Sequence, residues 1–199
     1  QSGGSGQYGH VKMRFSHGED EGLTFTQSVV GGTVPKNFYP AVEKGLLEAM
    51  QKGVLAGYPV VNLAADLYDG SYHPVDSNEL SFMLAGRHAF STAFKEAGPK
   101  LLEPIYDVEI FVPGDKMGDV MSDLQGRRGM ILGSSSENGY EKLVAKVPLK
   151  EMSSYSTTLS SITGGRASFI MKFASYELVP TDLQQKLMKE FEESDNDND

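Results

Sequence analysis

The stretch IYDVEIFV at residues 105–112 is rich in β-branched and aromatic residues and predicts a β-strand that opens the second half of the chain. The pattern that follows predicts a helix, two strands, a helix and a last strand, at 115–124, 130–134, 143–147, 151–162 and 167–176. The order β-α-β-β-α-β over roughly 80 residues is typical of a ferredoxin-like sandwich. A short terminal helix, capped by Thr181, is predicted at 183–191.

The first half of the chain has a different order of elements. Alternating and helical periodicities predict two strands, a helix, a third strand and a turn, at 11–15, 23–29, 40–50, 59–68 and 69–74. Asp76-Ser-Asn-Glu79 has the spacing of a capping box and predicts a further helix that ends before Gly98-Pro99. Together with the ferredoxin-like unit of the second half, this ββαβα unit predicts a two-domain α+β protein. We expect the domains at 1–102 and 103–179, followed by a helix and an acidic tail at 180–199.

The composition excludes several classes of site and of protein. Of the 199 residues, 39% are apolar and 23% are charged, which is enough to form folded cores. There is no cysteine, and this excludes disulfides, thiolate metal sites and a cysteine nucleophile. No apolar run approaches the roughly 20 residues that span a bilayer, and there is no signal peptide. We therefore expect a cytoplasmic protein with no membrane partner.

The net charge of −9 does not decide whether the partner is a nucleic acid. Six acidic residues fall in the last ten positions, 190–199, whereas residues 1–17 contain Lys12 and Arg14 and no acid. Phosphate binding depends on the local electrostatic field rather than on the total charge. A basic N-terminal region is therefore compatible with nucleic-acid binding.

The sequence contains no arrangement typical of catalysis or of a bound cofactor. There is no GxxxxGK[ST] phosphate loop, and GGRAS at 164–168 lies between a helix and a strand, the wrong order for holding phosphate on a helix N-terminus. His10, His17, His73 and His88 lack the spacing of metal ligands, and no Ser-His-Asp grouping is visible. We expect no catalytic, cofactor-binding or metal-binding residue in this chain.

Three loops carry the groups best suited to binding a polyanion. The Gly-rich segment 1–9 offers backbone N–H groups and glutamine amides. The turn at 69–74 presents Tyr72 and His73, which suit stacking on bases or hydrogen bonding to ribose. Arg127-Arg128 forms a basic turn that could clamp phosphate. On the residues alone, ordinary solvated loops remain the alternative in each case.

Longer motifs resemble bacterial elongation factor G, in the same order and from residue 1 to about 180. They are QSGGSGQYGHV (1–11), VGGTVPKNFYPAVEKG (30–45), LAGYPVVNLAADLYDGSYHPVDSNE (55–79), LLEPIYDVEI (101–110), GDVMSDLQGRRGMILG (118–133), VPLKEM (147–152) and GGRASF (164–169). The resemblance covers only the domains called IV and V in that family, without the first stretch of domain IV and without the GTP-binding domain. We therefore expect a C-terminal part of a longer protein, whose GTP and Mg²⁺ are bound outside this chain.

The resemblance implies a ribosome-binding role. In the family, domain IV is a ribosomal-protein-like unit whose tip reaches the decoding region of the small subunit and contacts tRNA and mRNA. The residues that match this tip are Gln1, Ser2, Gly3, Gly4, Ser71, Tyr72 and His73. Domain V is ferredoxin-like and lies near the GTPase-associated region of the large subunit, so Arg127 and Arg128 are expected to contact ribosomal RNA or another domain. The implied activity is translocation of tRNA and mRNA during elongation, by a monomeric factor.

Departures from the family pattern keep alternatives open. Ser5 stands where the family usually has an arginine, DSSE is replaced by Asp76-Ser-Asn-Glu79, and the segment 151–161 loses an aromatic–glycine pair and a basic residue. These changes fit a divergent paralogue, specialised in ribosome recycling or ribosome protection, as readily as an elongation factor. An alternative from another class is a ferredoxin-like module that binds a small ligand.

Overall fold

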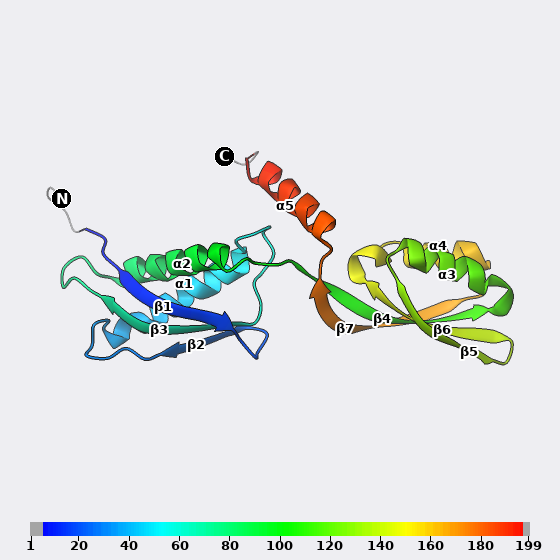
Figure 1. Ribbon diagram of the computed structural model, residues 1–199, viewed down its shortest axis with the longest axis horizontal. Helices are drawn as coiled ribbons and strands as arrows, with labels where there is room; N and C mark the ends of the chain where they lie inside the picture. Colours follow the sequence, from blue (N-terminus) through cyan, green and yellow to red (C-terminus); the bar gives the residue numbers. More distant parts are fainter. Residues whose placement is uncertain (1–5, 197–199) are drawn as a thin grey trace. The chain divides into compact units, whose positions relative to one another are not determined.

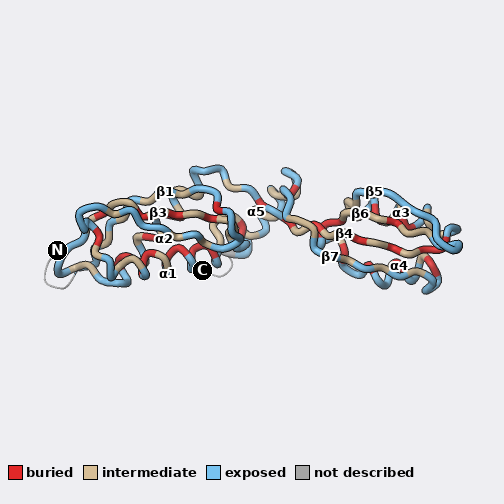
Figure 2. Tube along the Cα trace, turned by 90° about the horizontal axis from the view of Figure 1, so that it is seen from below, coloured by how far each residue is buried: buried red, intermediate tan, exposed pale blue. Residues whose placement is uncertain are grey.

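The computed structural model describes residues 6–196, with side chains up to residue 194, and the chain forms two compact units (Figure 1). One unit extends to Pro99 and also contains the residues from Gln185 on, and the other is Lys100–Gln184. In each unit, buried residues line the space between a sheet and a pair of helices (Figure 2). Each unit therefore has a hydrophobic core of its own.

The first unit is a three-stranded sheet with two helices on one face (Figure 1). Its elements are β1 (His10–His17), β2 (Leu23–Gln27), the 3-10 turn η1 (Lys36–Phe38), α1 (Tyr39–Lys52), β3 (Leu63–Ser71) and α2 (Glu79–Glu96). The central strand β3 pairs antiparallel with β1 and parallel with β2. The ββαβα order predicted from the sequence is confirmed.

Helices α1 and α2 pack closely because each has a glycine against the backbone of the other. A Cβ atom at Gly45 in α1 would collide with the carbonyl oxygen of Met83 in α2. A Cβ atom at Gly86 in α2 would lie 2.9 Å from the carbonyl oxygen of Val42 in α1. Protein interiors are close-packed, so this helix contact has no spare volume for an added methyl group. The two helices therefore lie in direct backbone contact on one face of the sheet.

The second unit is a four-stranded antiparallel sheet with the order β5-β6-β4-β7 and with two helices on one face (Figure 1). Its elements are β4 (Leu102–Pro113), η2 (Gly114–Lys116), α3 (Met117–Gly126), β5 (Met130–Glu137), β6 (Tyr140–Pro148), η3 (Leu149–Met152), α4 (Tyr155–Thr163) and β7 (Ser168–Leu178). Val108, Ile110, Leu124 and Leu143 are fully buried in its core. The predicted ferredoxin-like βαββαβ fold is confirmed.

The third strand of the first unit differs from its prediction at both ends. It begins at Leu63 rather than at residue 59, and it continues to Ser71. The extension at its end arises from pairing with β1, which places Ser71 opposite His10. The predicted turn at 69–74 is therefore wrong in its first three residues, because strand pairing overrides their local preference for a turn.

The predicted capping box of α2 is also wrong in its residues. Asn78, not Asp76, caps the helix: the N–H of Ser81 donates to Asn78 Oδ1 at 2.8 Å, and the N–H of Asn78 donates to Ser81 Oγ at 3.0 Å. Glu79 is then the first residue of the helix rather than the partner of the cap. The carboxylate of Asp76 is left available for bonds elsewhere.

The last helix, α5 (Thr181–Asn196), is longer than the predicted 183–191. Ion pairs one helical turn apart support this helix, and the second of them reaches beyond residue 191. They join Lys186 to Glu190 at 3.8 Å and Lys189 to Glu193 at 3.7 Å. Part of the acidic tail is therefore helical.

Candidate nucleic-acid interface

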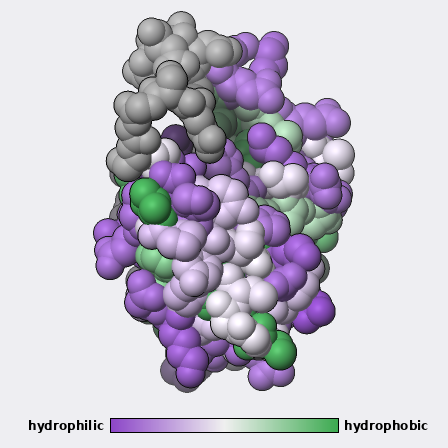
Figure 3. Space-filling view, turned by 90° about the vertical axis from the view of Figure 1, so that its left-hand side faces the viewer, coloured by the Kyte–Doolittle hydropathy of each residue, from purple (hydrophilic) through white to green (hydrophobic). Residues whose placement is uncertain are grey.

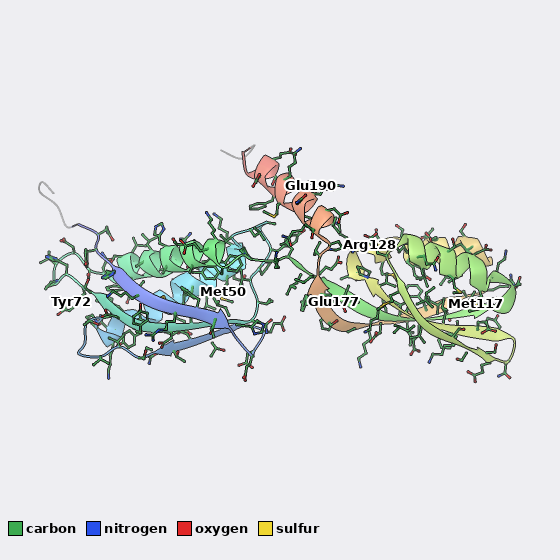
Figure 4. All side chains as sticks on the ribbon, in the orientation of Figure 1. Met50, Tyr72, Met117, Arg128, Glu177 and Glu190 are labelled. Atoms are coloured by element: carbon green, nitrogen blue, oxygen red, sulfur yellow. The ribbon has the colours of Figure 1, made fainter. Side chains whose placement is uncertain are left out.

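Two segments that are 70 residues apart in the sequence meet at one end of the first unit. The N–H of Gly6 donates to Asp76 Oδ1 at 2.8 Å, and the N–H of Tyr8 donates to the carbonyl oxygen of Asp76 at 2.9 Å. Figure 4 shows Tyr72 at this end and Met50 at the other end of the unit. We call residues 6–10 and 71–78 the tip.

The hydroxyl of Ser71 links the two segments of the tip. Its Oγ lies 2.7 Å from the hydroxyl of Tyr8 and 2.9 Å from Nδ1 of His10. The sequence predicts Ser71 as a contact to tRNA or mRNA, but in the structure its hydroxyl already has two partners within the tip. It thus links the side chains of Tyr8 and His10, and its predicted contact with tRNA or mRNA stays a prediction.

Tyr72 and His73 present their rings at the surface of the tip. Tyr72 is 46% exposed, and the side chain of His73 is 52% exposed. Nδ1 of His73 lies 3.3 Å from the backbone nitrogen of Asp76 and 3.2 Å from its Oδ2. Within residues 6–196, the ring of His73 makes its polar contacts through Nδ1. Nε2 is therefore the ring nitrogen available to a group outside the domain.

Four of the predicted contact residues, Gln1, Ser2, Gly3 and Gly4, lie outside the described residues. Figure 3 views the molecule from the end that carries Tyr72 and shows a mostly hydrophilic surface with isolated hydrophobic spots. An apolar docking surface would show a contiguous hydrophobic patch. Exposed rings in polar surroundings instead suit the sugars, phosphates and base edges of a nucleic acid.

Two basic side chains of β1 lie beside the tip, each near an aspartate of β3. Lys12 Nζ is 2.8 Å from Asp69 Oδ2, and Arg14 is 3.6 Å from Asp66 Oδ2, with its guanidinium 4.0 Å from the centre of the Tyr68 ring. The hydrogen bond from Lys12 lowers the pKa of Asp69 to about 2 and raises the pKa of Lys12. Both side chains of this pair are therefore charged at neutral pH.

The lowered pKa of Asp69 predicts a specific acid dependence of stability. The carboxylate has its ordinary pKa of 3.8 when unfolded and about 2 when folded, so its stabilising contribution is complete above 3.8 and disappears as the pH falls through 2. The difference in unfolding free energy between the wild type and Asp69→Asn should therefore be constant near pH 5. It should shrink as the pH falls from 3.8 to about 2. Urea unfolding at a series of pH values measures it, with Asp20→Asn as a control. A difference that persists undiminished at pH 2 would contradict the prediction.

Arg127, which the sequence predicts as an RNA or interdomain contact, is held inside the second unit. Its Nε donates to Asp123 Oδ2 at 2.9 Å, one terminal nitrogen donates to the carbonyl oxygen of Glu151 at 2.6 Å, and the other donates to Thr158 Oγ1 at 3.1 Å. The side chain is only 16% exposed. These bonds join α3 to the start of α4 and use most of the donors of the guanidinium.

Arg128 is bound in the same way. Its two terminal nitrogens donate to the two carboxylate oxygens of Glu103 at 2.8 and 2.9 Å, and its Nε donates to Glu151 Oε1 at 3.1 Å. The hydrogen bonds to Glu103 raise the pKa of Arg128 above its ordinary value. Both arginines therefore link segments within this unit, and a contact of either with ribosomal RNA or another domain stays a prediction.

Over residues 6–196, no group of three or more His, Asp or Glu side chains is arranged to hold a metal ion. Among the helices in the described part of the chain, none has the length and apolar character needed to cross a membrane.

Comparison with known families matches both units. The family model described as "Elongation factor G, domain IV" matches residues 1–98, and the model described as "Elongation factor G C-terminus" matches residues 100–187. The chain belongs to the elongation factor G family. The first unit is accordingly domain IV and the second is the C-terminal domain V, so the resemblance seen in the sequence motifs is confirmed.

Individual relatives agree with the family match. The chain is 50% identical over 192 residues to the elongation factor G-like protein of Thermotoga maritima, covering 96% of this chain and 28% of that protein. It is 48% identical over 191 residues to elongation factor G of Aquifex pyrophilus, covering 96% and 27%. A crystal structure of a protein from Thermus thermophilus has a TM-score of 0.85 at 42% identity, covering 97% of this chain and 29% of that one. The chain thus spans less than a third of these relatives.

Three residues that build the tip of domain IV, Tyr8, Asp76 and Ser77, are not among the contact residues predicted from the sequence. Tyr8 falls in the Gly-rich segment 1–9, and Asp76 and Ser77 fall in the predicted helix cap. Their partners lie on the other segment of the tip, so no local pattern indicates them. The one sequence signal for them is their place in motifs shared with elongation factor G.

Proposed function

We propose that this chain is the ribosome-binding, C-terminal part of a translational GTPase that promotes translocation of tRNA and mRNA during elongation. Its membership of the elongation factor G family supports the general role. The observation that carries the proposal is the tip, where two distant segments converge and leave the rings of Tyr72 and His73 exposed. We propose that Tyr72, His73 and the segment 1–4 contact the tRNA–mRNA duplex in the small-subunit decoding region.

The chemistry of the tip suits contacts that do not depend on sequence. A factor that moves every codon must bind the backbone of the duplex rather than base edges. A histidine N–H and an aromatic ring can contact phosphate oxygens, 2′-hydroxyl groups and base faces in any sequence context. Lys12 and Arg14 supply positive charge on the adjoining strand, at side-chain exposures of 50% and 69%.

GTP binding belongs, in this proposal, to another domain of the protein. The residues of this chain do not fit a GTP–Mg²⁺ site, because the sequence has no phosphate loop with its lysine and threonine or serine. The part that the structure describes also offers no carboxylate cluster of the kind that holds a metal ion. Domains IV and V would then act by position, and hydrolysis elsewhere would bias the conformation of the whole protein.

A single-round translocation assay with the full-length protein tests the proposal. Replacing His73 with alanine should slow tRNA movement on programmed ribosomes by about tenfold. This is the effect expected when the transition state of translocation loses one charge-assisted hydrogen bond. The rate of GTP hydrolysis should be unchanged. His17→Ala is the matched control, because it removes an exposed histidine at the other end of β1.

Three outcomes separate the alternatives. Unchanged translocation by His73→Ala would refute the assignment of the tip. Ribosome binding without any translocation by the wild type would indicate a paralogue that acts in recycling or ribosome protection. A protein that does not bind ribosomes but gains thermal stability with a small ligand would favour the ligand-binding alternative.

A further inference from the structure

We infer that Asp76, assisted by Ser77, is a positioning residue that joins the two segments of the tip and orients the ring of His73. The inference rests on the proposed function of the tip. It assigns to an acidic residue a role at a surface proposed to bind a polyanion, where a carboxylate cannot itself be a favourable ligand.

Asp76 makes contacts in three directions. Its Oδ1 accepts the N–H of Gly6 at 2.8 Å, its carbonyl oxygen accepts the N–H of Tyr8 at 2.9 Å, and its Oδ2 lies 3.2 Å from Nδ1 of His73. Its side chain is 20% exposed, compared with 52% for His73. The carboxylate is therefore more deeply buried in the tip than the histidine ring.

Ser77, the next residue, also joins the two segments of the tip. The N–H of His73 donates to Ser77 Oγ at 2.9 Å, and the Ser77 hydroxyl donates to the carbonyl oxygen of Tyr8 at 2.8 Å. The N–H of Ser77 donates to the carbonyl oxygen of His73 at 3.0 Å. One hydroxyl thus bridges the turn that carries His73 and the segment that leads into β1.

These bonds have two consequences for binding. With the proton on Nδ1 of His73 directed at Asp76 Oδ2, the ring holds Nε2 in one direction, so this nitrogen is oriented before the partner arrives. Preorganisation of this kind lowers the ordering cost of binding. The hydrogen bond from Gly6 to Asp76 also joins the segment 6–10 to the turn that carries His73, so these two segments are held together.

Translocation with the full-length protein tests the inference through three variants. Asp76→Ala should slow single-round translocation by about five- to tenfold, since it removes the bond to Gly6 and the partner of His73 together. Asp76→Asn keeps an oxygen for Gly6 and a polar partner for His73 and should recover most of the rate. Asp20→Ala removes an exposed carboxylate at the β1–β2 turn and should leave the rate unchanged.

A spectroscopic measurement separates positioning from general loss of structure. The ¹⁵N resonances of the His73 ring, recorded on the 199-residue chain, should show a larger share of the neutral tautomer with its proton on Nδ1 in the wild type than in Asp76→Ala, because only the carboxylate can accept from Nδ1. The melting temperature should change little. If Asp76→Ala does not fold, Ser77→Ala replaces it, and the same slowing is expected because the bridge to Tyr8 is lost.

The failure of the inference can be distinguished from the failure of the proposed function. Slow translocation by His73→Ala together with normal rates for Asp76→Ala and Ser77→Ala would overturn the positioning role alone. Normal rates for all three variants would overturn the proposed contact of the tip as well. An unchanged tautomer pattern in Asp76→Ala would also overturn the positioning role.

Discussion

Replacing Gly45 with alanine is expected to destabilise domain IV by about 3 kcal/mol. The new Cβ atom would collide with the carbonyl oxygen of Met83, which belongs to the backbone of α2 and cannot rotate away. The helices would have to separate, and separation would loosen the packing around Leu46 and Phe82, which are fully buried. Urea unfolding measures the loss, and hydrogen exchange of the α1 and α2 amides assigns it to this domain.

Gly118→Ala provides the matched control for this substitution. Gly118 is also helical, in α3, but a Cβ atom there meets nothing within 4 Å. Alanine should therefore stabilise the chain slightly, by about 0.5–1 kcal/mol, because it lowers the conformational entropy of the unfolded state. If Gly45→Ala behaved like Gly118→Ala, α1 and α2 would not be in the close contact described here.

Replacing Arg128 with alanine is expected to cost domain V about 3 kcal/mol. The substitution leaves the carboxylate of Glu103, which is only 8% exposed, without its bidentate partner. Breaking a buried ion pair from one side costs roughly 3–5 kcal/mol, because the remaining charge is desolvated and unpaired. The lower end applies because the side chain of Arg128 is itself 31% exposed. Unfolding in urea, with exchange of the β4 amides as the local probe, measures the effect.

Arg166→Ala is the corresponding control for an exposed pair. Arg166 lies 3.3 Å from Asp115, and the two side chains are 50% and 63% exposed. Pairs of this kind contribute at most about 1 kcal/mol. An Arg128→Ala variant no less stable than Arg166→Ala would show that Glu103 is not held by this pair, and the arginine would again be a candidate for RNA contact.

The two arginines show where sequence reasoning about the site reached its limit. Arg127-Arg128 occurs as an adjacent basic pair in a turn, and this local pattern is the same for a phosphate clamp and for a structural pair. The acids that bind Arg128 are Glu103 and Glu151, which lie 25 and 23 residues away. Only the folded sheet brings them together, so a count of local charge could not distinguish the two roles.

The tip also shows which functional residues a local sequence pattern can and cannot indicate. Tyr72 and His73 could be singled out in the sequence because a turn with an aromatic residue and a histidine is recognisable by itself. Asp76 could not, because its local context resembles a helix cap and its actual partner, Gly6, lies 70 residues earlier. The sequence predicts a cap in this region but from the wrong residues, since Asn78 and Ser81 form the capping box.

The sequence by itself determined the order of elements, the ferredoxin-like pattern of the second unit and the family to which the motifs belong. These follow from hydrophobic periodicity and motif spacing, which are properties of neighbouring residues. Only the tertiary structure decided that β3 extends to Ser71, that Asp76 faces Gly6, and that Arg128 is paired with Glu103. Each of these contacts joins segments that meet through strand pairing and core packing, and their free energy depends on the whole fold rather than on local sequence.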